Sequence, residues 1–375
     1  MAENGTIVTE ALVCSSLGGE FEIKRLTVDD IREDELLVRI VASGICHTDF
    51  SCADGTTPVE FPFVGGHEGA GVVERIGAHV NHVEVGDHVL LSFSSCGKCA
   101  PCRRNIRAYC RDVFRMNFSG SRDDGSKAFT MEDGSPVSSH FFGQSSFARR
   151  TVVRAVSAIK IEKSLPLDIL CSMGCGMQTG AGTVLNVLRP AMGQTVVIFG
   201  AGAVGLAAVM AAKLTPASMV IVVDLVASKL ITARELGATH IINANETDTL
   251  AQIGSLTDGF GVDRAMDTTG NIHVIKTMID CAAPGGLVAT VGAPRKGRII
   301  EIEPATWLAR GISYVGVHQG SSDPQKFVLY LVQLWKDGRF PVDRLVNTFS
   351  YGEMREATDA LRKGICIKAV LLWDE

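Results

Sequence analysis

Short apolar runs alternate with longer apolar or amphipathic stretches between residues 179 and 291. A short continuous apolar run is typical of a strand that is buried on both faces, and the stretches between the runs are long enough for helices. We predict strands at 195–199, 219–223, 264–267 and 287–291, and helices at 205–213, 228–236 and 274–281. This alternation indicates βαβ units, and therefore a parallel sheet covered on both faces.

The pattern on either side of this region is different. Before residue 179, segments in which apolar and polar residues alternate predict β-structure, at 20–26, 35–40, 71–76, 88–93, 151–155 and 158–161. A helix is expected from Leu167 into 171–180. After residue 292 we predict a strand pair within 298–316, helices at 325–336 and 353–361, and a strand at 367–373.

These patterns predict an α/β protein with a discontinuous domain. No linker rich in Pro, Gly or Ser and no internal repeat is evident, and 375 residues exceed one average domain. We expect a β-rich domain at 1–177 with a cysteine lobe at 94–113, an inserted nucleotide domain at 178–317, and a return to the first domain at 318–375.

Composition narrows the classes of partner. A hydrophobic fraction of 46%, 21% charged residues and a net charge of -5 without long runs of either sign describe a compact globular chain. This balance argues against nucleic acid and against an anionic membrane, and favours a small-molecule ligand. Residues 1–11 lack a basic region and an apolar run, so no secretory signal is expected, and glycines interrupt the apolar stretch at 195–212. We expect a cytoplasmic protein whose eleven cysteines are reduced or bind metal.

Two ionisable residues, His67 and Glu68, lie among four glycines in the run 65–71. Glycines permit close approach and positive φ angles, so this run predicts a turn that presents both side chains inward. A histidine in a turn is often only hydrogen-bonded. It becomes a candidate metal ligand if cysteines from elsewhere, such as Cys46 and Cys175, converge on it.

Four cysteines follow the pattern CxxCxxCxxxxxxxC within one loop, at Cys96, Cys99, Cys102 and Cys110. Four thiolates at this spacing can surround one zinc ion and leave no position for a substrate, which predicts a structural site. Four free cysteines are one alternative. An iron–sulfur cluster is another, although its bacterial pattern places the fourth cysteine three residues on, before a proline.

A GxGxxG run, residues 200–205, follows the predicted strand at 195–199 and opens a helix. In this context the run is typical of a dinucleotide site, because the bare backbone amides at a helix N-terminus can hold a pyrophosphate. Asp224, at the end of the next strand, is placed to accept hydrogen bonds from a ribose and to repel a 2′-phosphate, which favours NAD over NADP. The alternative is an aspartate that only caps the following helix. Lys229 could add a ribose contact or be an exposed helix lysine.

Together these motifs resemble the zinc-dependent medium-chain alcohol dehydrogenases over almost the whole chain. The markers stand in the family's order: GICHTD at 44–49, GHEGAG at 66–71, the cysteine lobe, GCG at 174–176 and GAGAVG at 200–205. The loops NFSG at 117–120 and HFFGQSSFA at 140–148 are similar to the aryl-alcohol (benzyl alcohol) branch. The resemblance implies a β-rich GroES-like catalytic domain and a Rossmann coenzyme domain with a doubly wound parallel sheet.

The resemblance also assigns roles to residues. Cys46, His67 and Cys175 are implied as ligands of a catalytic zinc, in addition to the structural zinc, with Glu68 beside the metal and Asp49 hydrogen-bonded to His67. Thr48 is implied to contact the substrate oxygen and to begin the proton path. Implied NAD contacts, besides Asp224 and Lys229, are Thr179, Gly200, Gly202, Val204, Gly205, Val291, His47 and Lys368.

One departure from the family concerns the proton path. Many relatives end the relay with a histidine three residues after Thr48, and this chain has Ser51 there. We hypothesise that the proton leaves through Thr48, the cofactor ribose, and then water or His47. Lys368 stands where relatives often have an arginine on the pyrophosphate, which is a less bidentate contact.

By position, the substrate pocket is implied to include Phe93, Phe142, His318 and Phe118. Aromatic walls favour flat apolar substrates, although core packing explains the same residues, for Phe118 above all. The resemblance predicts an NAD-dependent dehydrogenase of primary aromatic or allylic alcohols, and a homodimer that pairs the strand near 312–317. The alternatives are a glutathione-dependent formaldehyde dehydrogenase, with Arg115 as a carboxylate anchor, and a non-catalytic zinc- and nucleotide-binding relative.

Overall fold

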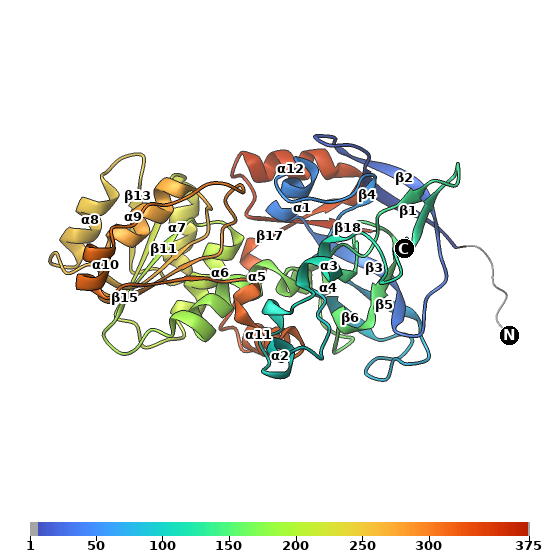
Figure 1. Ribbon diagram of the computed structural model, residues 1–375, viewed down its shortest axis with the longest axis horizontal. Helices are drawn as coiled ribbons and strands as arrows, with labels where there is room; N and C mark the ends of the chain where they lie inside the picture. Colours follow the sequence, from blue (N-terminus) through green and yellow to red (C-terminus); the bar gives the residue numbers. More distant parts are fainter. Residues whose placement is uncertain (1–6, 374–375) are drawn as a thin grey trace. The chain divides into compact units, whose positions relative to one another are not determined.

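The computed structural model describes residues 7–373 and divides into two compact units (Figure 1). Unit 1 comprises residues up to Cys175 together with Asp323–Gln333 and Val342 onward, and unit 2 comprises Gly176–Ser322 and Leu334–Pro341. Residues 1–6 and 374–375, which belong to the expected catalytic domain, lie outside the described residues. Residues 1–6 are also the start of segment 1–11, for which no secretory signal is expected. Among residues 7–373, no helix combines the length and the apolar character needed to cross a bilayer.

Unit 1 is built on two β-sheets. The first has the strand order β4 (Phe63–Val64), β1 (Ile7–Cys14), β2 (Phe21–Val28), β7 (Phe129–Met131), β8 (Pro136–Val137). The second has the order β10 (Ala158–Ile161), β6 (His88–Leu91), β5 (Gly69–Ile76), β3 (Glu35–Gly44), β18 (Lys368–Leu372), β17 (Val346–Ser350), and β9 (Arg150–Arg154) also pairs with β3. Apolar side chains of both sheets share one buried core, which confirms the predicted β-rich domain.

The helices of unit 1 are mostly short. They are α1 (His47–Ala53), α2 (Ala100–Arg103), α3 (Val113–Phe118), α4 (Leu167–Leu170) and α12 (Met354–Arg362). The longer α11 (Pro324–Lys336) begins in unit 1 and ends in residues assigned to unit 2. Strand β18 lies between β3 and β17 in the sheet, so a segment late in the chain completes the layer that begins at residue 35.

Unit 2 contains the predicted parallel sheet. Its strand order is β13 (His240–Asn243), β12 (Met219–Asp224), β11 (Thr195–Phe199), β14 (Val262–Asp267), β15 (Ala282–Thr290), β16 (Ser313–Gly316), and every pair is parallel. Its helices are α5 (Gly176–Gly182), α6 (Ala203–Ala212), α7 (Ala227–Leu236), α8 (Thr249–Leu256), α9 (Ile272–Asp280) and α10 (Pro304–Arg310). From the centre of the sheet, β11, β12 and β13 follow one another towards one edge, and β14, β15 and β16 follow one another towards the other edge. This is the order of a doubly wound Rossmann sheet.

Two local predictions were wrong. The strand pair expected within 298–316 is helix α10 followed by the single strand β16. Pro304 at the helix start and Gly311 at its end, with φ 60°, are the signals that mark α10. The helix expected to run from Leu167 into 171–180 is interrupted at Cys175, whose φ of -142° and ψ of -82° are not helical.

The unit boundary near residue 318 also differs from the expected position. Residues 319–321 form a 3₁₀ turn that packs on α5: Asn186 donates to the Gly320 carbonyl and Ser322 to the Gln178 side chain. A Cβ atom on Gly182 would lie 2.5 Å from the Gly320 carbonyl oxygen, so the two backbones are in close contact. The segment up to Ser322 therefore groups with unit 2.

A buried charge network joins distant parts of unit 1. Arg122 donates to the Glu35 carboxylate through Nε and Nη2, at 2.9 and 3.0 Å, and His140 Nε2 lies 3.0 Å from Glu35 Oε1. All three side chains are buried. Burial opposes ionisation of Glu35, yet the hydrogen bonds from His140 and Arg122 lower the pKa of its carboxyl to about 2.

This network predicts an acid-sensitive contribution to stability. Because the folded-state pKa of Glu35 lies below its ordinary value of 4.5, its contribution is present above about pH 5 and is lost as the pH falls towards 2. We expect the difference in unfolding free energy between wild type and Glu35→Gln to shrink by about 2 kcal/mol between pH 6 and pH 3 in urea titrations. The exposed neighbour Glu33 supplies the control Glu33→Gln. A pH-independent difference for Glu35→Gln would contradict this assignment.

Candidate active site

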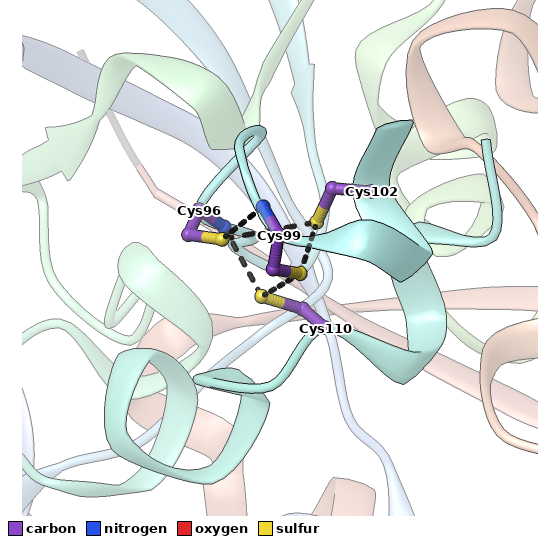
Figure 2. Close-up of side chains that lie close together, drawn as sticks. All are labelled: Cys96, Cys99, Cys102 and Cys110. Carbon is purple, nitrogen blue, oxygen red and sulfur yellow. Dashed lines mark hydrogen bonds between the residues drawn. The ribbon is translucent and has the colours of Figure 1, made fainter. Parts of the chain in front are cut away.

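Four sulfur atoms converge in the loop that carries α2 (Figure 2). Cys99 Sγ lies 3.4 Å from Cys102 Sγ and 3.9 Å from Cys110 Sγ, and Cys96 Sγ lies 4.0 Å from Cys102 Sγ. A zinc ion with four sulfur ligands at about 2.3 Å requires sulfur–sulfur separations of about 3.8 Å. The predicted tetrahedral set is therefore assembled, and all four residues are free thiols.

Backbone amides support negative charge in this cluster. The amide of Cys96 donates to Cys110 Sγ at 3.3 Å, and that of Cys99 donates to Cys96 Sγ at 3.4 Å. Hydrogen bonds from the backbone of Arg111 and Cys102 lower the pKa of Cys99 to about 6, whereas burial raises that of Cys102 to about 12. A divalent cation would balance the charge of four thiolates, so the residues present fit a structural zinc.

Three residues from separate parts of unit 1 form a second candidate metal site. The ligand atoms of Cys46, His67 and Cys175 all lie within 4.8 Å of one another. Cys46 is the N-cap of α1, and Cys175 occupies the helix break. His67 lies in the predicted glycine turn, where Gly66 has φ 82° and a Cβ atom there would lie 2.4 Å from the Phe147 amide. Only glycine fits at that position.

Asp49 holds two of these residues in place. Its Oδ1 accepts from His67 Nδ1 at 3.1 Å and from the Gly66 amide at 3.0 Å, and its Oδ2 accepts from the Cys46 amide at 3.0 Å. Both His67 and Asp49 are fully buried. The hydrogen bond assigns the proton to Nδ1 and directs Nε2 towards the sulfur atoms, as a metal-ligating histidine requires.

The donor set fits a metal ion. Nε2 of His67 is buried and has no hydrogen-bond partner among residues 7–373, which is unusual for a polar atom. A hydrogen bond from Cys175 lowers the pKa of Cys46 well below its ordinary value. Burial opposes protonation of His67, but Asp49 and Cys46 raise its pKa. A thiolate beside a protonated imidazole is an arrangement in which a metal cation can replace the proton.

Glu68 makes a buried ion pair that the sequence did not reveal. Its Oε2 accepts from Lys368 Nζ at 2.8 Å, and Lys368 also donates to the Ile45 carbonyl at 3.0 Å. Burial raises the pKa of Glu68 and Lys368 opposes that rise, while Glu68 and Cys46 raise the pKa of Lys368 in spite of its burial. Lys368, assigned to the pyrophosphate by resemblance, thus lies against the acidic neighbour of His67.

The proposed proton-path residues share helix α1. His47 is exposed, whereas Thr48 and Ser51 are half-buried. Thr48 Oγ1 lies 3.9 Å from Cys46 Sγ, so its hydroxyl borders the candidate metal site. Apart from the motif, the apolar pattern did not indicate this helix, because the buried Asp49 interrupts it.

Phenylalanine rings surround the His67 imidazole. The Phe142 ring stacks on it with centroids 4.5 Å apart, Phe141 meets it edge-on at 5.3 Å, and Phe118 packs on Phe142 at 5.0 Å. Phe93 belongs to the same buried cluster. Of the expected pocket residues, these come together in unit 1, and His318 belongs to unit 2. Phe141 was missed because a loop has no periodicity that separates inward from outward positions.

The glycine run of unit 2 forms the expected turn between β11 and α6. Gly200 has φ 97°, Gly202 is the N-cap of α6, and Val204 lies in the first turn of that helix. A Cβ atom on Gly205 would lie 1.8 Å from the Gly200 carbonyl oxygen, so the helix can approach the turn only with glycine there. No side chain caps the α6 N-terminus, which leaves its amides available for a phosphate.

Other predicted cofactor residues lie at or just after strands β12 and β15 and on helices α5 and α7. Asp224 ends β12, and its carboxylate accepts from the Ala201 amide at 2.6 Å and from the Val226 amide at 2.9 Å. These bonds tie Asp224 to the glycine turn and to the residue that precedes α7. The N-cap of α7 is Val226 and the helix has no side-chain cap, so the alternative in which Asp224 only caps this helix is wrong. Val291 follows β15, Lys229 lies in the first turn of α7, and Thr179 lies on α5.

Arg115, the candidate anchor for glutathione, already has a partner. Its Nη1 lies 2.7 Å from Asp123 Oδ1, and this hydrogen bond raises the pKa of Arg115. A substrate carboxylate would have to displace Asp123.

Comparisons with known proteins agree on one family. Residues 32–163 match the family model described as the alcohol dehydrogenase GroES-like domain, and residues 203–334 match the model described as zinc-binding dehydrogenase. The chain is 38% identical over 369 residues to geraniol dehydrogenase from Castellaniella defragrans, with 98% of both chains covered.

Two solved structures show the same fold over nearly the full length. Benzyl alcohol dehydrogenase from Acinetobacter calcoaceticus is 40% identical, with 98% of this chain and 100% of that chain covered, and the TM-score is 0.94. An alcohol dehydrogenase zinc-binding domain protein from Burkholderia ambifaria is 43% identical, with coverage of 99% and 100% and a TM-score of 0.95.

Proposed function

Because this chain belongs to the zinc-dependent medium-chain alcohol dehydrogenases, we propose that it interconverts primary aromatic or allylic alcohols and their aldehydes with NAD. The observation that carries the proposal is the convergence of Cys46, His67 and Cys175, in which the buried His67 Nε2 lacks a partner among the described residues. Three protein ligands leave the fourth position of a tetrahedral metal open to a substrate.

The names of two relatives support the substrate class. Geraniol is an allylic alcohol and benzyl alcohol an aromatic one, and both place an unsaturated carbon next to the carbinol. In this chain, Phe141 and Phe142 pack on the imidazole of His67, and Phe118 packs on both of these rings. Aromatic rings beside the reacting position favour a flat unsaturated group through apolar burial and edge-to-face contacts.

Each protein group has a task in this reaction. Zinc, when bound, supplies a Lewis acid that brings the pKa of an alcohol hydroxyl towards neutrality, and NAD supplies the hydride acceptor. Cys46 and Cys175 provide two negative ligands, and Asp49 fixes the tautomer of His67. Thr48 Oγ1, beside the metal site, would accept the substrate proton, and the exposed His47 or water would take it to solvent, because Ser51 cannot serve as the histidine of the usual relay. A bound NAD would supply ribose hydroxyls to this path.

The glycine turn and Asp224 support NAD as the cofactor. We expect Asp224→Asn to lower the preference for NAD over NADP, as the ratio of the two kcat/KM values, by about tenfold or more, since it removes a negative charge and one ribose acceptor. The matched control is Asp263→Asn, because Asp263 also accepts a backbone amide in this sheet, from Thr195. An unchanged ratio in Asp224→Asn, or an equal change in the control, would refute the role of Asp224.

A substrate panel tests the proposed function. Benzyl alcohol, geraniol, ethanol and S-hydroxymethylglutathione should be compared as kcat/KM on zinc-replete protein with NAD and with NADP. We expect benzyl alcohol and geraniol to exceed ethanol by at least about a hundredfold, since each buried methylene-sized group contributes about 0.8 kcal/mol. Preference for the glutathione adduct would favour the formaldehyde dehydrogenase alternative, and no turnover with any alcohol would favour a non-catalytic relative.

Three finer features belong to the same proposal. Two metal-binding groups support two zinc ions per chain, one structural and one catalytic. The eleven free cysteines are consistent with the reducing cytoplasm.

A homodimer is supported by the edge strand β16, with exposed Tyr314, and by Ile299 and Leu308, which are 75% and 84% exposed.

A further inference from the structure

A buried loop, residues 139–147, lies against the turn that carries His67. The amides of Ser146 and Phe147 donate to the carbonyls of Gly66 and Gly65, at 2.9 and 3.0 Å. These backbone bonds pair the loop with the residues just before the candidate metal ligand. The loop is therefore the immediate support of the turn from one side.

Gln144 extends this support to the backbone that follows His67, on both sides of Glu68. Its Nε2 donates to the His67 carbonyl at 2.9 Å, and its Oε1 accepts from the Gly69 amide at 3.0 Å. The same Nε2 also lies 3.3 Å from the Ser92 carbonyl. The side chain is completely buried, so these bonds do not compete with solvent.

The chemistry of these contacts requires a carboxamide. A backbone amide can only donate and a backbone carbonyl can only accept, so the partners fix which end of the Gln144 side chain is oxygen. A carboxylate of the same size can accept from Gly69 but cannot donate to His67. A methionine of similar size can do neither.

Backbone conformation indicates that the position of Gln144 is strongly constrained. Its neighbours Phe142, Gly143 and Ser145 have φ angles of 51°, 70° and 46°. Non-glycine residues persist in this region only where the surrounding structure over-determines them. Thr151 Oγ1 donates to the Gln144 carbonyl at 2.6 Å, and Phe142 stacks on the His67 imidazole.

We propose that Gln144 is a positioning residue for His67 in the metal site formed with Cys46 and Cys175. The inference rests on the proposed function, because it assumes that this site binds zinc. Gln144 fixes the backbone directly after the ligand, and its neighbours Ser146 and Phe147 fix the backbone before it, so the approach of Nε2 is restricted to one geometry. Outer groups that orient a ligating histidine typically change metal affinity by about 10–100-fold.

The test compares Gln144→Glu with Gln325→Glu in the full-length zinc protein. Gln325 is the matched control, because its Nε2 also donates to two backbone carbonyls of unit 1, those of Val156 and Ala158, both at 3.0 Å. We expect a chelator to release one zinc from Gln144→Glu at least about tenfold faster than from wild type. The rate for Gln325→Glu should stay within twofold of wild type, even if its melting temperature falls.

Spectroscopy supplies a second readout. With cobalt in the Cys46 site, the visible absorption bands of Gln144→Glu should shift, whereas those of Gln325→Glu should match wild type. If the buried carboxylate prevents folding, Gln144→Met tests the same point without a charge, and the same release rate and band shift are expected. Unchanged release rates and spectra in a folded Gln144 variant would overturn the proposal. Wild type that holds only the zinc of the cysteine lobe would instead refute the proposed function.

Discussion

Replacing Cys175 with serine is expected to remove one of two zinc ions per chain and to lower kcat/KM for benzyl alcohol by at least about a thousandfold. The thiolate is one of three ligands that meet within 4.8 Å, and a neutral hydroxyl is a poor substitute in a site with few donors. Lewis-acid stabilisation contributes several kcal/mol to the transition state, and about 4 kcal/mol corresponds to a thousandfold in rate.

The chain offers a close control for this variant. Cys171 lies four residues earlier, is also buried, and its Sγ lies 3.6 Å from the Asp168 carbonyl. Cys171→Ser should keep both zinc ions and lower kcat/KM less than tenfold. Metal analysis and steady-state kinetics of the two variants, side by side, check the assignment. Two zinc ions in Cys175→Ser, or equal loss of activity in both variants, would contradict it.

Replacing Cys110 with serine is expected to lower the stability of the fold rather than to affect catalysis directly. Cys110 is buried, and its sulfur completes the four-cysteine cluster. Much of the free energy of binding a structural zinc is folding free energy, so losing the metal should lower the melting temperature by about 10 °C or more. The loop 96–110 has little apolar core of its own, since Cys102, Ala108 and Cys110 are its buried hydrophobic residues.

A buried cysteine outside the cluster separates zinc loss from simple cavity formation. Cys52 is completely buried in unit 1, and burial raises the pKa of its thiol. Cys52→Ala should lower the melting temperature by only a few degrees and retain two zinc ions. Scanning calorimetry with metal analysis distinguishes the outcomes. A Cys110→Ser protein with one zinc and an unchanged transition would show that the cluster does not stabilise the fold.

Features with local signals were predicted well from the sequence. The strand predicted at 195–199 is β11, and the glycine run forms the expected turn before α6. The four cysteines of the lobe are close in sequence, so their spacing alone indicates a shared ion. The βαβ region was similarly accessible, because both its periodicity and its turn residues are local.

Features that depend on distant residues have no local signal in the sequence. Cys46, His67 and Cys175 were assigned by family resemblance, since no spacing rule connects residues so far apart. The ion pair of Glu68 with Lys368 joins residues 300 positions apart. Gln144 looked like one polar residue in an aromatic loop, because only the folded backbone reveals its two partners on the His67 turn.

The place of β18 in its sheet has a consequence for biosynthesis. Strand β9 pairs with residues 35–39 of β3, but residues 42–44 have no partner on that edge until β18 has been translated, because Val370 pairs with Gly44 and Leu372 with Ala42. Lys368, which neutralises Glu68, arrives on that same strand. The strands of the parallel sheet in unit 2 are contiguous in the sequence, so this sheet can form earlier on the ribosome. In unit 1, part of one edge of β3 stays unpaired until β18 is synthesised. A stop codon before residue 368 would therefore leave this part of β3 unpaired and the acidic side chain of Glu68 buried without its countercharge.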